Sequence, residues 1–398
     1  MIQSLKGYLL ILDINKIIDL ETRKIIDLLL NNNADVYLVG GAVRDYYLNY
    51  PINDLDFEIY NLDFETLKYL LKDYNYYAND TFKTIKLANI ELALPRVEEK
   101  VGLNYLDYQL TFTNVSVKQA IKRRDFTINT LMYNLKETKL YDFCDGRYDL
   151  ENKLLKAVDY QKFNEDSIRV LRLLKYQSKL AFKIDQTTYC LAKEMACNLW
   201  YQPHEMCASL FSTIINSKHF DLILFFDLLD NFFNVTALKN NISTSIHHPE
   251  KSLYNHLIGV LKCLFLHQIN NKRDYEILFW SLFFHDYGKL DDNNNHCLAS
   301  LKYFEKYQPY LLQRHKDISM VRRLINDHMV IREYSEQNDK VKMTELKKEY
   351  GNQFYLLEII GTCDYAGRVL DFNEVEYQKR IKWYNSNILS KYKEVDNG

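Results

Sequence analysis

The feature that most constrains this chain is the stretch YLVGGAVRDYYLNYPINDLDFEIY at residues 37–60. Val36 to Val39 is an apolar run that stops at Gly40 and Gly41, which predicts a buried strand entering a tight turn. A helix is expected to follow from about residue 42 to 48. The backbone N–H groups of such a turn, at the start of a helix, suit the phosphates of a nucleotide.

Acidic and apolar residues alternate directly after this turn, from residue 54 to 59. The two-residue period of a strand predicts that the acids, Asp54, Asp56 and Glu58, share one face and that the apolar residues pack on the other. Neighbouring carboxylates repel one another unless cations neutralise them. Magnesium suits carboxylates and phosphates, and two ions about 3.5–4 Å apart can promote phosphoryl transfer. The alternative is an exposed Asp-x-Asp that is merely solvated.

Length and composition set the frame for this motif. A chain of 398 residues has room for two or three domains, and 47% hydrophobic with 26% charged residues is typical of a soluble globular protein. The net charge of −2 leaves no global basic field, so any RNA contact must rest on local patches. The seven cysteines form no Cys-x-x-Cys pair, which argues against a zinc knuckle or a disulfide framework and for a reducing compartment. No signal peptide or membrane span is recognisable, so a cytoplasmic protein is expected.

Two further segments offer groups that would complete such a site. A strand predicted over Leu87 to Leu94 carries Glu91 opposite its apolar residues, which makes Glu91 a candidate third carboxylate or a surface glutamate. Residues 75–86 are expected to form a loop before that strand. Asp125 and Asn129 follow three cations and would share a face of a helix, where they could hold phosphates and ribose. The alternative for the three cations is a solvated surface.

These motifs resemble, in order and spacing, those of the tRNA nucleotidyltransferases, the CCA-adding enzymes, and of the similar bacterial poly(A) polymerases. The matching segments are Gly40-Gly41-Ala42-Val43-Arg44-Asp45, Asp54-Leu55-Asp56, Glu91 to Arg96 and Arg123 to Asn129. Downstream, Tyr141-Asp142-Phe143 with Gly146 and Asp149 resembles the hinge between head and neck, and Glu165-Asp166-Ser167-Ile168-Arg169 resembles a neck motif.

The resemblance implies a role for each matched residue. Asp54 and Asp56 would bind two Mg²⁺ with Glu91 as helper, while Glu58 drops out of the ligand set. The residues implied in nucleotide binding are Gly40, Gly41, Arg44, Arg124 and Asn129 for the triphosphate, Asp125 for the ribose, Asp166 and Arg169 for the base, and Arg172.

Asp166 and Arg169 are expected side by side on a helix. A carboxylate accepts from the exocyclic amine of C or A, and a guanidinium donates to ring nitrogens or carbonyls, so such a pair can prefer C and A over U and G. The alternative is an intrahelical salt bridge worth about 0.3–0.5 kcal/mol.

The chain departs from the family pattern at two places. Phe143 stands where the hinge motif has proline, and Pro203-His204-Glu205-Met206 stands where a later neck motif usually has a Glu-Arg pair. The second departure leaves open whether the chain adds all three nucleotides, C, C and A.

A second set of candidate residues lies in the C-terminal half. His256, His285-Asp286 and Asp364, with Lys289 after the doublet, resemble the HD-domain phosphohydrolases, in which imidazoles and carboxylates hold a divalent ion such as Ni, Mn, Co, Mg or Zn. Lys289 would contact a phosphate oxygen. A lone His-Asp doublet is also common in protein cores. The other histidines, at 247, 248, 296 and 328, are interpreted mainly as surface residues, with His296 and His328 kept as candidate ligands for a second ion.

The sequence therefore predicts an α+β protein: a polymerase-β-like nucleotidyltransferase head with a mixed, mainly antiparallel sheet, followed by a mainly helical neck and a helical HD domain. The expected domains are residues 1–137, 138–220 and 221–375, with a C-terminal helix and tail over 376–398. The function implied is addition of C-C-A to tRNA from CTP and ATP, with phosphohydrolase activity in the HD domain. The alternatives are an A-only adding enzyme, a bacterial poly(A) polymerase, or an HD phosphohydrolase with a non-catalytic RNA-binding head. No membrane partner is expected.

Overall fold

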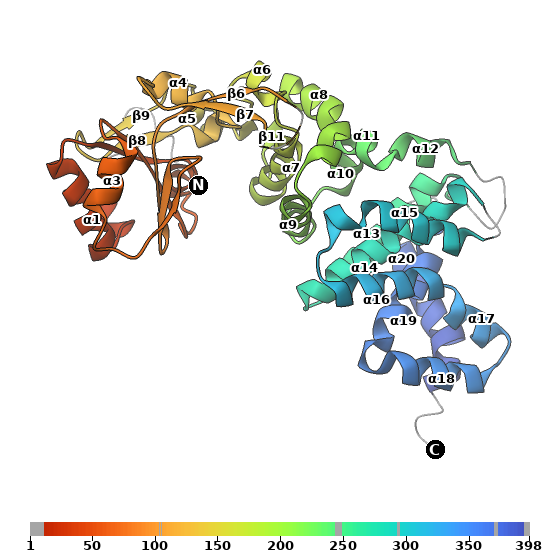
Figure 1. Cartoon of the computed structure of the whole chain (residues 1–398). Helices are drawn as coiled ribbons and strands as arrows, with labels where there is room; N and C mark the ends of the chain where they lie inside the picture. Colours follow the sequence, from red (N-terminus) through yellow and green to blue (C-terminus); the bar gives the residue numbers. More distant parts are fainter. Residues whose placement is uncertain are drawn as a thin grey trace. The chain divides into compact units, whose positions relative to one another are not determined.

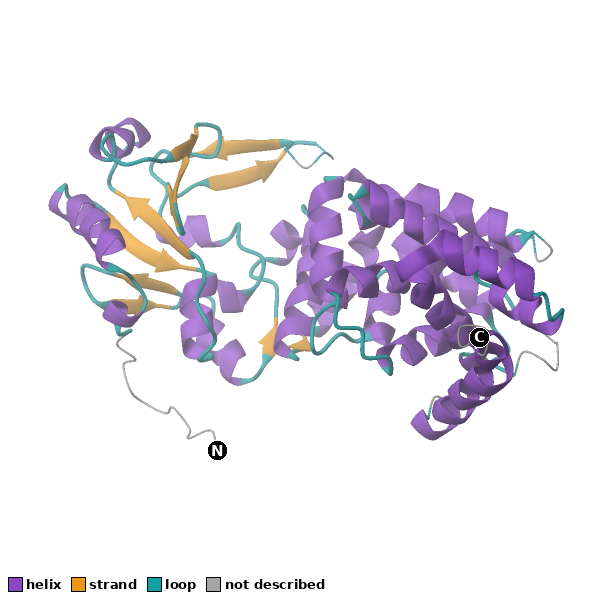
Figure 2. Cartoon of the chain, turned by 90° about the horizontal axis from the view of Figure 1, so that it is seen from below, coloured by secondary structure: helices purple, strands orange, loops and turns teal. Residues whose placement is uncertain are grey.

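The computed structural model describes residues 12–102, 104, 106–242, 249–292, 295–369 and 373–393 (Figure 1). The chain forms two compact units, one made of Met1–Arg169 with Leu180–Met195 and the other of Val170–Lys179 with Ala196–Gly398. Strands are concentrated in the first unit, and the second unit is helical (Figure 2). Within the described ranges, no helix has both the length and the apolar character needed to cross a membrane.

The first unit contains a sheet with helices between its strands. Its strands are β1 (Asp35–Val39), β2 (Leu55–Tyr60), β3 (Tyr77–Asn79), β4 (Thr84–Leu87), β5 (Ile90–Ala93), β6 (Val97–Lys100), β7 (Tyr108–Thr111), β8 (Met132–Asn134), β9 (Lys139–Tyr141), β10 (Leu154–Leu155) and β11 (Lys183–Ile184). Its helices are η1 (Ile14–Lys16), α1 (Leu20–Asn31), α2 (Gly41–Tyr47), α3 (Phe64–Leu70), α4 (Val117–Ile121), η2 (Thr127–Asn129), α5 (Gly146–Glu151), α6 (Tyr160–Phe163) and α8 (Gln186–Met195). Helix α7 (Ile168–Leu180) contributes residues to both units.

The main sheet has seven strands in the order β3-β4-β5-β2-β1-β8-β9. Strands β2 and β5 run parallel, and the other neighbouring pairs run antiparallel. This mixed, mainly antiparallel sheet beside a helical remainder confirms the predicted α+β fold class. Two short strand pairs, the antiparallel β6-β7 and the parallel β10-β11, stand outside this sheet.

The predicted alternation of acidic and apolar residues along β2 holds, but the acidic face is not exposed along its whole length. Asp54 precedes the strand, Asp56 is exposed, and Glu58 is only 1% exposed. The apolar face is buried as expected, through Leu55, Phe57 and Ile59. The two-residue alternation of a strand shows which residues share a face, but it does not show which residues of the acidic face are buried by other parts of the chain.

The single strand predicted over 87–94 is also wrong. The chain forms a β4-β5 hairpin that turns at Ala88, whose φ is +42°, and Ala88 is followed by Asn89. The predicted loop at 75–86 contains β3 and most of β4, so polar residues there belong to the sheet edge. Glu91 lies on β5 as expected.

The sheet continues past residue 137, because β9 pairs with β8 in antiparallel register. The predicted boundary at residue 137 therefore falls inside the sheet. The contacts also divide the expected neck between the two units. The assignment of head, neck and HD domain as functional parts stays a prediction.

The second unit is built from helices. They are η3 (Ala196–Tyr201), α9 (His204–Ile215), α10 (Leu222–Leu228), α11 (Asp230–Phe233), α12 (Val235–Asn240), α13 (Leu253–Phe265), α14 (Lys272–Phe284), η4 (Tyr287–Leu290), α15 (His296–Leu311), α16 (His315–Asp327), α17 (Val330–Glu336), α18 (Lys340–Tyr350), η5 (Gly351–Gln353), α19 (Phe354–Ala366), α20 (Glu374–Tyr384), the π-helical turn η6 (Asn385–Leu389) and α21 (Ser390–Lys393). Side-chain caps start several of them, for example Ser252, which accepts from the backbone N–H of Asn255 at the start of α13.

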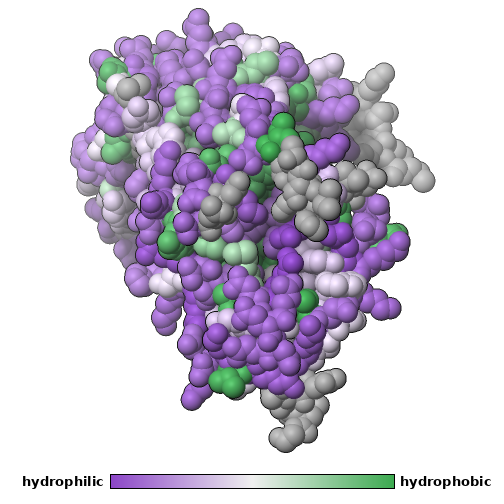
Figure 3. Space-filling view, turned by 90° about the vertical axis from the view of Figure 1, so that its right-hand side faces the viewer, coloured by the Kyte–Doolittle hydropathy of each residue, from purple (hydrophilic) through white to green (hydrophobic). Residues whose placement is uncertain are grey.

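Aromatic side chains fill the core of this unit. Trp280 is fully buried, with its ring centroid 5.7 Å from that of Phe211 and 5.6 Å from that of Phe283. Helices α13, α14 and α19 pack against one another. The face drawn in Figure 3 is mainly hydrophilic, with hydrophobic residues in small scattered groups. The terminal helical turns are packed as well, since the Tyr392 hydroxyl donates to Glu358 at 3.0 Å.

Candidate functional site

The structure pairs two of the predicted catalytic carboxylates. Asp56 on β2 and Glu91 on β5 are direct partners in the parallel register, and both are exposed. Asp54 is exposed just before β2. The pKa of Asp56 is raised, first because surrounding protein removes water from it and next because of the charge of Glu91, with a further contribution from Asp54. Asp54, Asp56 and Glu91 thus lie close enough for their charges to interact, and three such carboxylates form a donor set suited to a hard cation such as Mg²⁺.

The glycine turn predicted from the sequence lies beside two arginines. Gly40 has φ +68° and precedes α2, which begins at Gly41. A Cβ on Gly40 would lie 3.4 Å from Nη1 of Arg124, and one on Gly41 would lie 3.5 Å from Nη2 of Arg44. The positive φ favours glycine at residue 40, and both arginine side chains lie at ordinary contact distance from the turn.

Four predicted nucleotide-binding residues form one hydrogen-bond network. Nη1 of Arg44 donates to Oδ1 of Asn129 at 2.5 Å, and Nδ2 of Asn129 donates to Oδ1 of Asp125 at 2.9 Å. Nη1 of Arg124 donates to the Asn129 carbonyl at 2.9 Å. Arg44 is only 3% exposed and also contacts Asp45 at 2.8 Å, so in this structure it positions Asn129 rather than presenting a free cation.

Glu58 is a site residue to which the sequence analysis gave no role. Its Oε1 lies 2.6 Å from Nη2 of Arg123 and 3.4 Å from Nη2 of Arg124, and Tyr60 donates to its Oε2 at 3.1 Å. Burial acts to raise the pKa of Glu58, but the charges of Arg124 and Arg123 outweigh it and hold the pKa below its usual value. Glu58 therefore orients the arginines instead of binding a metal. Alternation along β2 placed the residue correctly but gave no sign of its partners.

The predicted helix around Asp125 and Asn129 is wrong, although the two residues do meet. Helix α4 ends at Ile121, and only the short turn η2 covers 127–129. That turn is held by α5, where a Cβ on Gly146 would come within 2.3 Å of the Thr127 carbonyl oxygen. Such close backbone approach requires glycine.

The hinge-like motif keeps its turn without the expected proline. The carboxylate of Asp142 accepts from the backbone N–H of Gly146 at 2.8 Å and of Arg147 at 3.0 Å. Phe143 is 40% exposed, and its ring stacks on that of Tyr141 with centroids 5.7 Å apart. The Asp142 cap thus supplies the chain reversal at this point.

The predicted base-reading pair differs from its expected geometry. Helix α7 begins at Ile168, so Asp166 lies before it and accepts from the Ile168 N–H at 3.1 Å. The closest approach of Arg169 Nε to Asp166 Oδ2 is 3.9 Å. The Arg169 guanidinium instead donates to the carbonyls of Lys162 and Arg123, both at 2.7 Å. The two side chains are neighbours, but a tight intrahelical salt bridge is not formed.

Two further predicted features lie outside this network. Arg172 is half-buried on α7, and its Nη2 donates to the Tyr176 hydroxyl at 3.4 Å. At the departure from the neck motif, Pro203 precedes α9, and the ring of His204 packs on Tyr310 with centroids 4.4 Å apart.

The second unit brings together the four predicted ligands His256, His285, Asp286 and Asp364. All four are buried, and one ligand atom from each lies within 4.8 Å of the others. Nε2 of His256 lies 3.1 Å from Oδ1 of Asp364, 3.3 Å from Oδ2 of Asp286 and 3.3 Å from Nε2 of His285. They meet because α13 and α19 carry two of them while the doublet follows α14, and these three helices pack together.

The surroundings of this group favour metal binding. Nδ1 of His285 lies 2.7 Å from the Leu282 carbonyl, so that nitrogen carries the proton and Nε2 keeps its lone pair for an ion. Burial would raise the pKa of Asp286, but the charges of His285 and Lys289 hold it well below its usual range. Nζ of Lys289 lies 2.5 Å from Oδ2 of Asp286, so Lys289 is paired with one of the candidate ligands, and its contact with a phosphate stays a prediction. Two imidazoles and two carboxylates, all buried, fit a divalent ion.

The candidate histidines His296 and His328 adjoin the same aspartate. Their Nε2 atoms lie 3.4 Å and 3.8 Å from Oδ1 of Asp286, and 3.4 Å from each other. Cys297 completes a second group within 4.8 Å. Both histidines are buried, so the surface interpretation does not apply to them. His247 and His248 lie outside the described residues.

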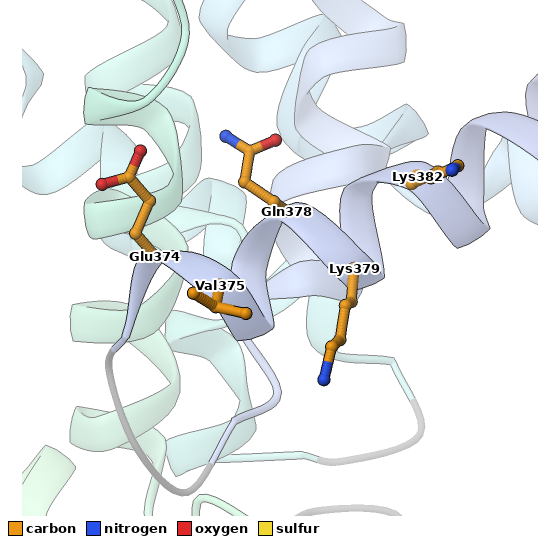
Figure 4. A pocket seen from close by; sticks show the side chains of 5 residues that line it. All are labelled: Glu374, Val375, Gln378, Lys379 and Lys382. Carbon is orange, nitrogen blue, oxygen red and sulfur yellow. The ribbon is translucent and has the colours of Figure 1, made fainter.

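Two surface hollows formed by the described residues contain none of these candidate residues. One, along α20, is lined by Glu374, Val375, Gln378, Lys379 and Lys382 (Figure 4). Another is lined by residues of α14, α16, η5 and the start of α19, among them Arg273, Asp317 and Tyr355. The candidate residues lie in two clusters of polar side chains, one in each unit.

Residues 36–156 match a family described as the poly A polymerase head domain. A multifunctional CCA protein of Haemophilus ducreyi is 29% identical over 276 residues, which is 64% of this chain and 64% of that protein. A CCA-adding enzyme of Buchnera aphidicola is 34% identical over 163 residues, which is 40% of this chain and 39% of that one. The chain thus spans less than two thirds of the length of these relatives.

Solved structures show the same fold over most of the chain. The Thermotoga maritima CCA-adding enzyme complexed with tRNA has a TM-score of 0.60 at 18% identity, over 94% of this chain and 83% of that one. A CCA-adding enzyme in complex with CTP has a TM-score of 0.59 at 18% identity, over 94% and 82%.

Residues 36–156, which contain the glycine turn and the paired carboxylates, are similar to the class of poly A polymerase head domains. Within that class, the resemblance to the CCA-adding tRNA nucleotidyltransferases predicted from the motifs is confirmed.

Proposed function

We propose that this chain adds CMP and AMP, from CTP and ATP, to the 3′ end of tRNA. The observation that carries the proposal is the in-register pair of Asp56 and Glu91. The charge of Glu91 raises the pKa of Asp56, and the charge of Arg124, which belongs to the nucleotide network, lowers it. The names of the relatives, which are CCA proteins, and of the structures with tRNA and CTP support the same assignment.

The proposed roles follow from the geometry of the first unit. Asp54 and Asp56, helped by Glu91, would hold Mg²⁺. Bound Mg²⁺ supplies charge neutralisation on the triphosphate and a more acidic attacking hydroxyl. Gly40, Gly41 and Arg124 would bind the triphosphate, because backbone N–H groups and a guanidinium there face the same turn.

Three residues would select and hold the nucleoside. Asp125 would accept from the ribose hydroxyl, while Asp166 and Arg169 would face the base. Because Arg169 is fixed by two backbone carbonyls, its remaining donors have a defined direction. A fixed donor beside the Asp166 carboxylate can distinguish bases that carry an amine from bases that carry a carbonyl at that edge.

The test is incorporation on tRNA transcripts lacking zero to three 3′ nucleotides, with the products sequenced. The wild type is expected to restore C-C-A, and Asp56→Asn to abolish incorporation with tRNA binding retained. Glu65→Gln, at an exposed acid on α3, is the control. Normal incorporation by Asp56→Asn would refute the carboxylate assignment, and no incorporation by the wild type would make the first unit an RNA-binding module.

A narrower activity is favoured by one observation, the His204–Tyr310 packing where a Glu-Arg pair is usual. An A-only adding enzyme would extend tRNA ending in C-C and fail on tRNA lacking both C residues. A poly(A) polymerase would make long A tails without preferring tRNA. The same sequencing experiment separates the three.

We also propose that the second unit is a metal-dependent phosphohydrolase acting on 2′,3′-cyclic or 2′-phosphates of RNA ends. The buried set His256, His285, Asp286 and Asp364 supports this activity, and a bound divalent ion supplies Lewis-acid polarisation of a phosphate and a more acidic water. His296, Cys297 and His328 extend the set around Asp286, which could serve two ions.

The test is hydrolysis of cyclic nucleotides and RNA ends with Ni²⁺, Mn²⁺, Co²⁺, Mg²⁺ or Zn²⁺ added separately. His285→Ala should lose hydrolysis, and the exposed His315→Ala should keep it. Equal rates in His285→Ala and wild type would show that the histidine–aspartate group has only a structural role.

A further inference from the structure

A second cluster in the helical unit lies apart from the ligands described above. Cys263 is on α13, Cys363 is on α19, and His267 lies just after the end of α13, one helical turn from Cys263. Their ligand atoms lie within 4.8 Å of one another, and Sγ of Cys363 is 3.9 Å from Nδ1 of His267. Both cysteines are fully buried, while His267 is half-buried.

A close helix crossing creates this cluster. A Cβ on Gly259 would come within 2.3 Å of the Gly367 carbonyl oxygen, and one on Gly367 within 2.7 Å of the Val260 nitrogen. Cys263 lies one turn after Gly259, and Cys363 lies one turn before Gly367. The two glycines thus bring the helices together, and the thiols face each other beside the crossing.

We propose that Cys263, His267 and Cys363 form a binding site for a borderline-soft divalent ion of the zinc class. Two thiolates and one imidazole are a ligand set that zinc takes in tetrahedral sites. With Zn–S near 2.3 Å and Zn–N near 2.0–2.1 Å, tetrahedral ligands lie roughly 3.5–3.8 Å apart. The observed 3.9 Å between Cys363 Sγ and His267 Nδ1 is close to this spacing.

The half-buried His267 gives the ion a way in, and a water can complete its coordination. Binding releases one proton from each thiol and leaves Nδ1 of His267 unprotonated, so the contact of that atom with the Cys263 carbonyl at 3.1 Å is exchanged for a bond to the ion. No electron transfer is involved. The bound ion would join α13 to α19, the helices that also carry His256 and Asp364.

The site is distinct from the histidine–aspartate group. Asp364 follows Cys363 directly, and adjacent residues of a helix point in directions about 100° apart. The Asp364 carboxylate contacts His256 and Arg368, whereas the Cys363 thiol contacts His267. The two sets therefore use different faces of α19.

The test is Co²⁺ binding to the full chain, read as thiolate-to-cobalt charge-transfer absorption, which imidazole and carboxylate ligands alone do not give. Cys297→Ser is used as the background in every sample, because the Cys297 thiol lies beside the candidate ligands His296 and His328. One Co²⁺ per chain is expected to give this absorption, and adding Cys263→Ser or Cys363→Ser should abolish it. Cys190→Ser, at an exposed cysteine on α8, is the matched control and should leave it unchanged.

Absence of the absorption in the background protein, or its persistence after either substitution, would overturn the proposal. A disulfide between Cys263 and Cys363 in protein purified under reducing conditions, detected by mass spectrometry, would also overturn it. Should the cysteine variants fail to fold, His267→Ala provides the decision because its side chain is half-buried. The Co²⁺ affinity should fall by about 10-fold or more, since removing a residue that only orients a metal ligand already costs this much. An unchanged affinity would refute the site.

Discussion

Glu58 is a buried carboxylate whose function is to hold other side chains. It pairs with Arg123 and Arg124 and accepts from Tyr60, while its neighbour two residues earlier, Asp56, remains exposed. One strand therefore presents one acid for an ion and uses another to position the cations of the nucleotide network.

Glu58→Ala should destabilise the protein by about 3–5 kcal/mol, because it leaves two arginines without their buried counter-charge. Urea unfolding measures the change. Glu65→Ala removes a largely exposed acid paired with Lys68 and should cost less than about 1 kcal/mol. Equal stability of the Glu58 and Glu65 variants would contradict the role assigned to the buried pair.

Arg169 binds two backbone carbonyls through separate guanidinium nitrogens. Arg169→Lys keeps the charge but loses this fork, so discrimination between CTP or ATP and UTP should decrease, with a loss of stability of about 1–2 kcal/mol. Incorporation rates for the four nucleotides provide the measurement. Lys179→Ala, later on α7, is the control, and unchanged selectivity in Arg169→Lys would remove Arg169 from base recognition.

At the scale of elements, the nucleotide network depends on how α5 meets η2. Gly146 approaches the Thr127 carbonyl, and the Asp149 carboxylate accepts from the Thr127 hydroxyl at 2.6 Å. Asn129, which links Arg44 to Asp125, ends this same turn. A hinge-like motif distant in sequence thus fixes the geometry of the nucleotide site.

Gly146→Ala should raise the KM for nucleotides, because its Cβ would displace η2 and with it Asn129. Overpacking of this kind costs about 1–3 kcal/mol. Steady-state kinetics at saturating tRNA would detect the change. Glu151→Ala, at the half-exposed end of the same helix, should leave KM unaltered, and equal KM values for the two variants would contradict the coupling.

At the scale of the whole molecule, the two candidate sites belong to separate compact units. Each unit has its own buried core, one around the sheet and one among aromatic helices. Separate cores allow a site in one unit to be altered while the other unit keeps its structure.

The variants Asp56→Asn and His285→Ala should therefore act independently. The first should lose nucleotide addition and keep hydrolysis, and the second should do the reverse. In each variant the retained activity should stay within about twofold of wild type, since independent sites add within about 0.3–0.5 kcal/mol. Parallel assays of both activities in the two single variants test this, and a larger loss of the retained activity would show coupling between the units.

The sequence by itself determined the fold class and the residue types of both sites. The motifs predicted which side chains would lie together, and this holds for Asp56, Glu91, Asp125, Asn129 and the four histidine–aspartate ligands. The types of side chain in a site decide its chemistry, and these types can be identified from the sequence. Periodicity also placed β1, α2 and the buried face of β2, since a local repeat shows which residues share a face.

Tertiary structure alone decided which neighbours those residues meet. The burial of Glu58 against two arginines, the position of Asp166 before α7, the β4-β5 hairpin and the pairing of Lys289 with Asp286 all depend on chain segments packed from elsewhere. The Cys263–His267–Cys363 cluster arises where two helices cross at Gly259 and Gly367. Its two cysteines are 100 residues apart, so their spacing in the sequence does not predict the cluster. Local pattern is read along one segment, whereas burial, ion pairing and ligand geometry are properties of several segments in contact.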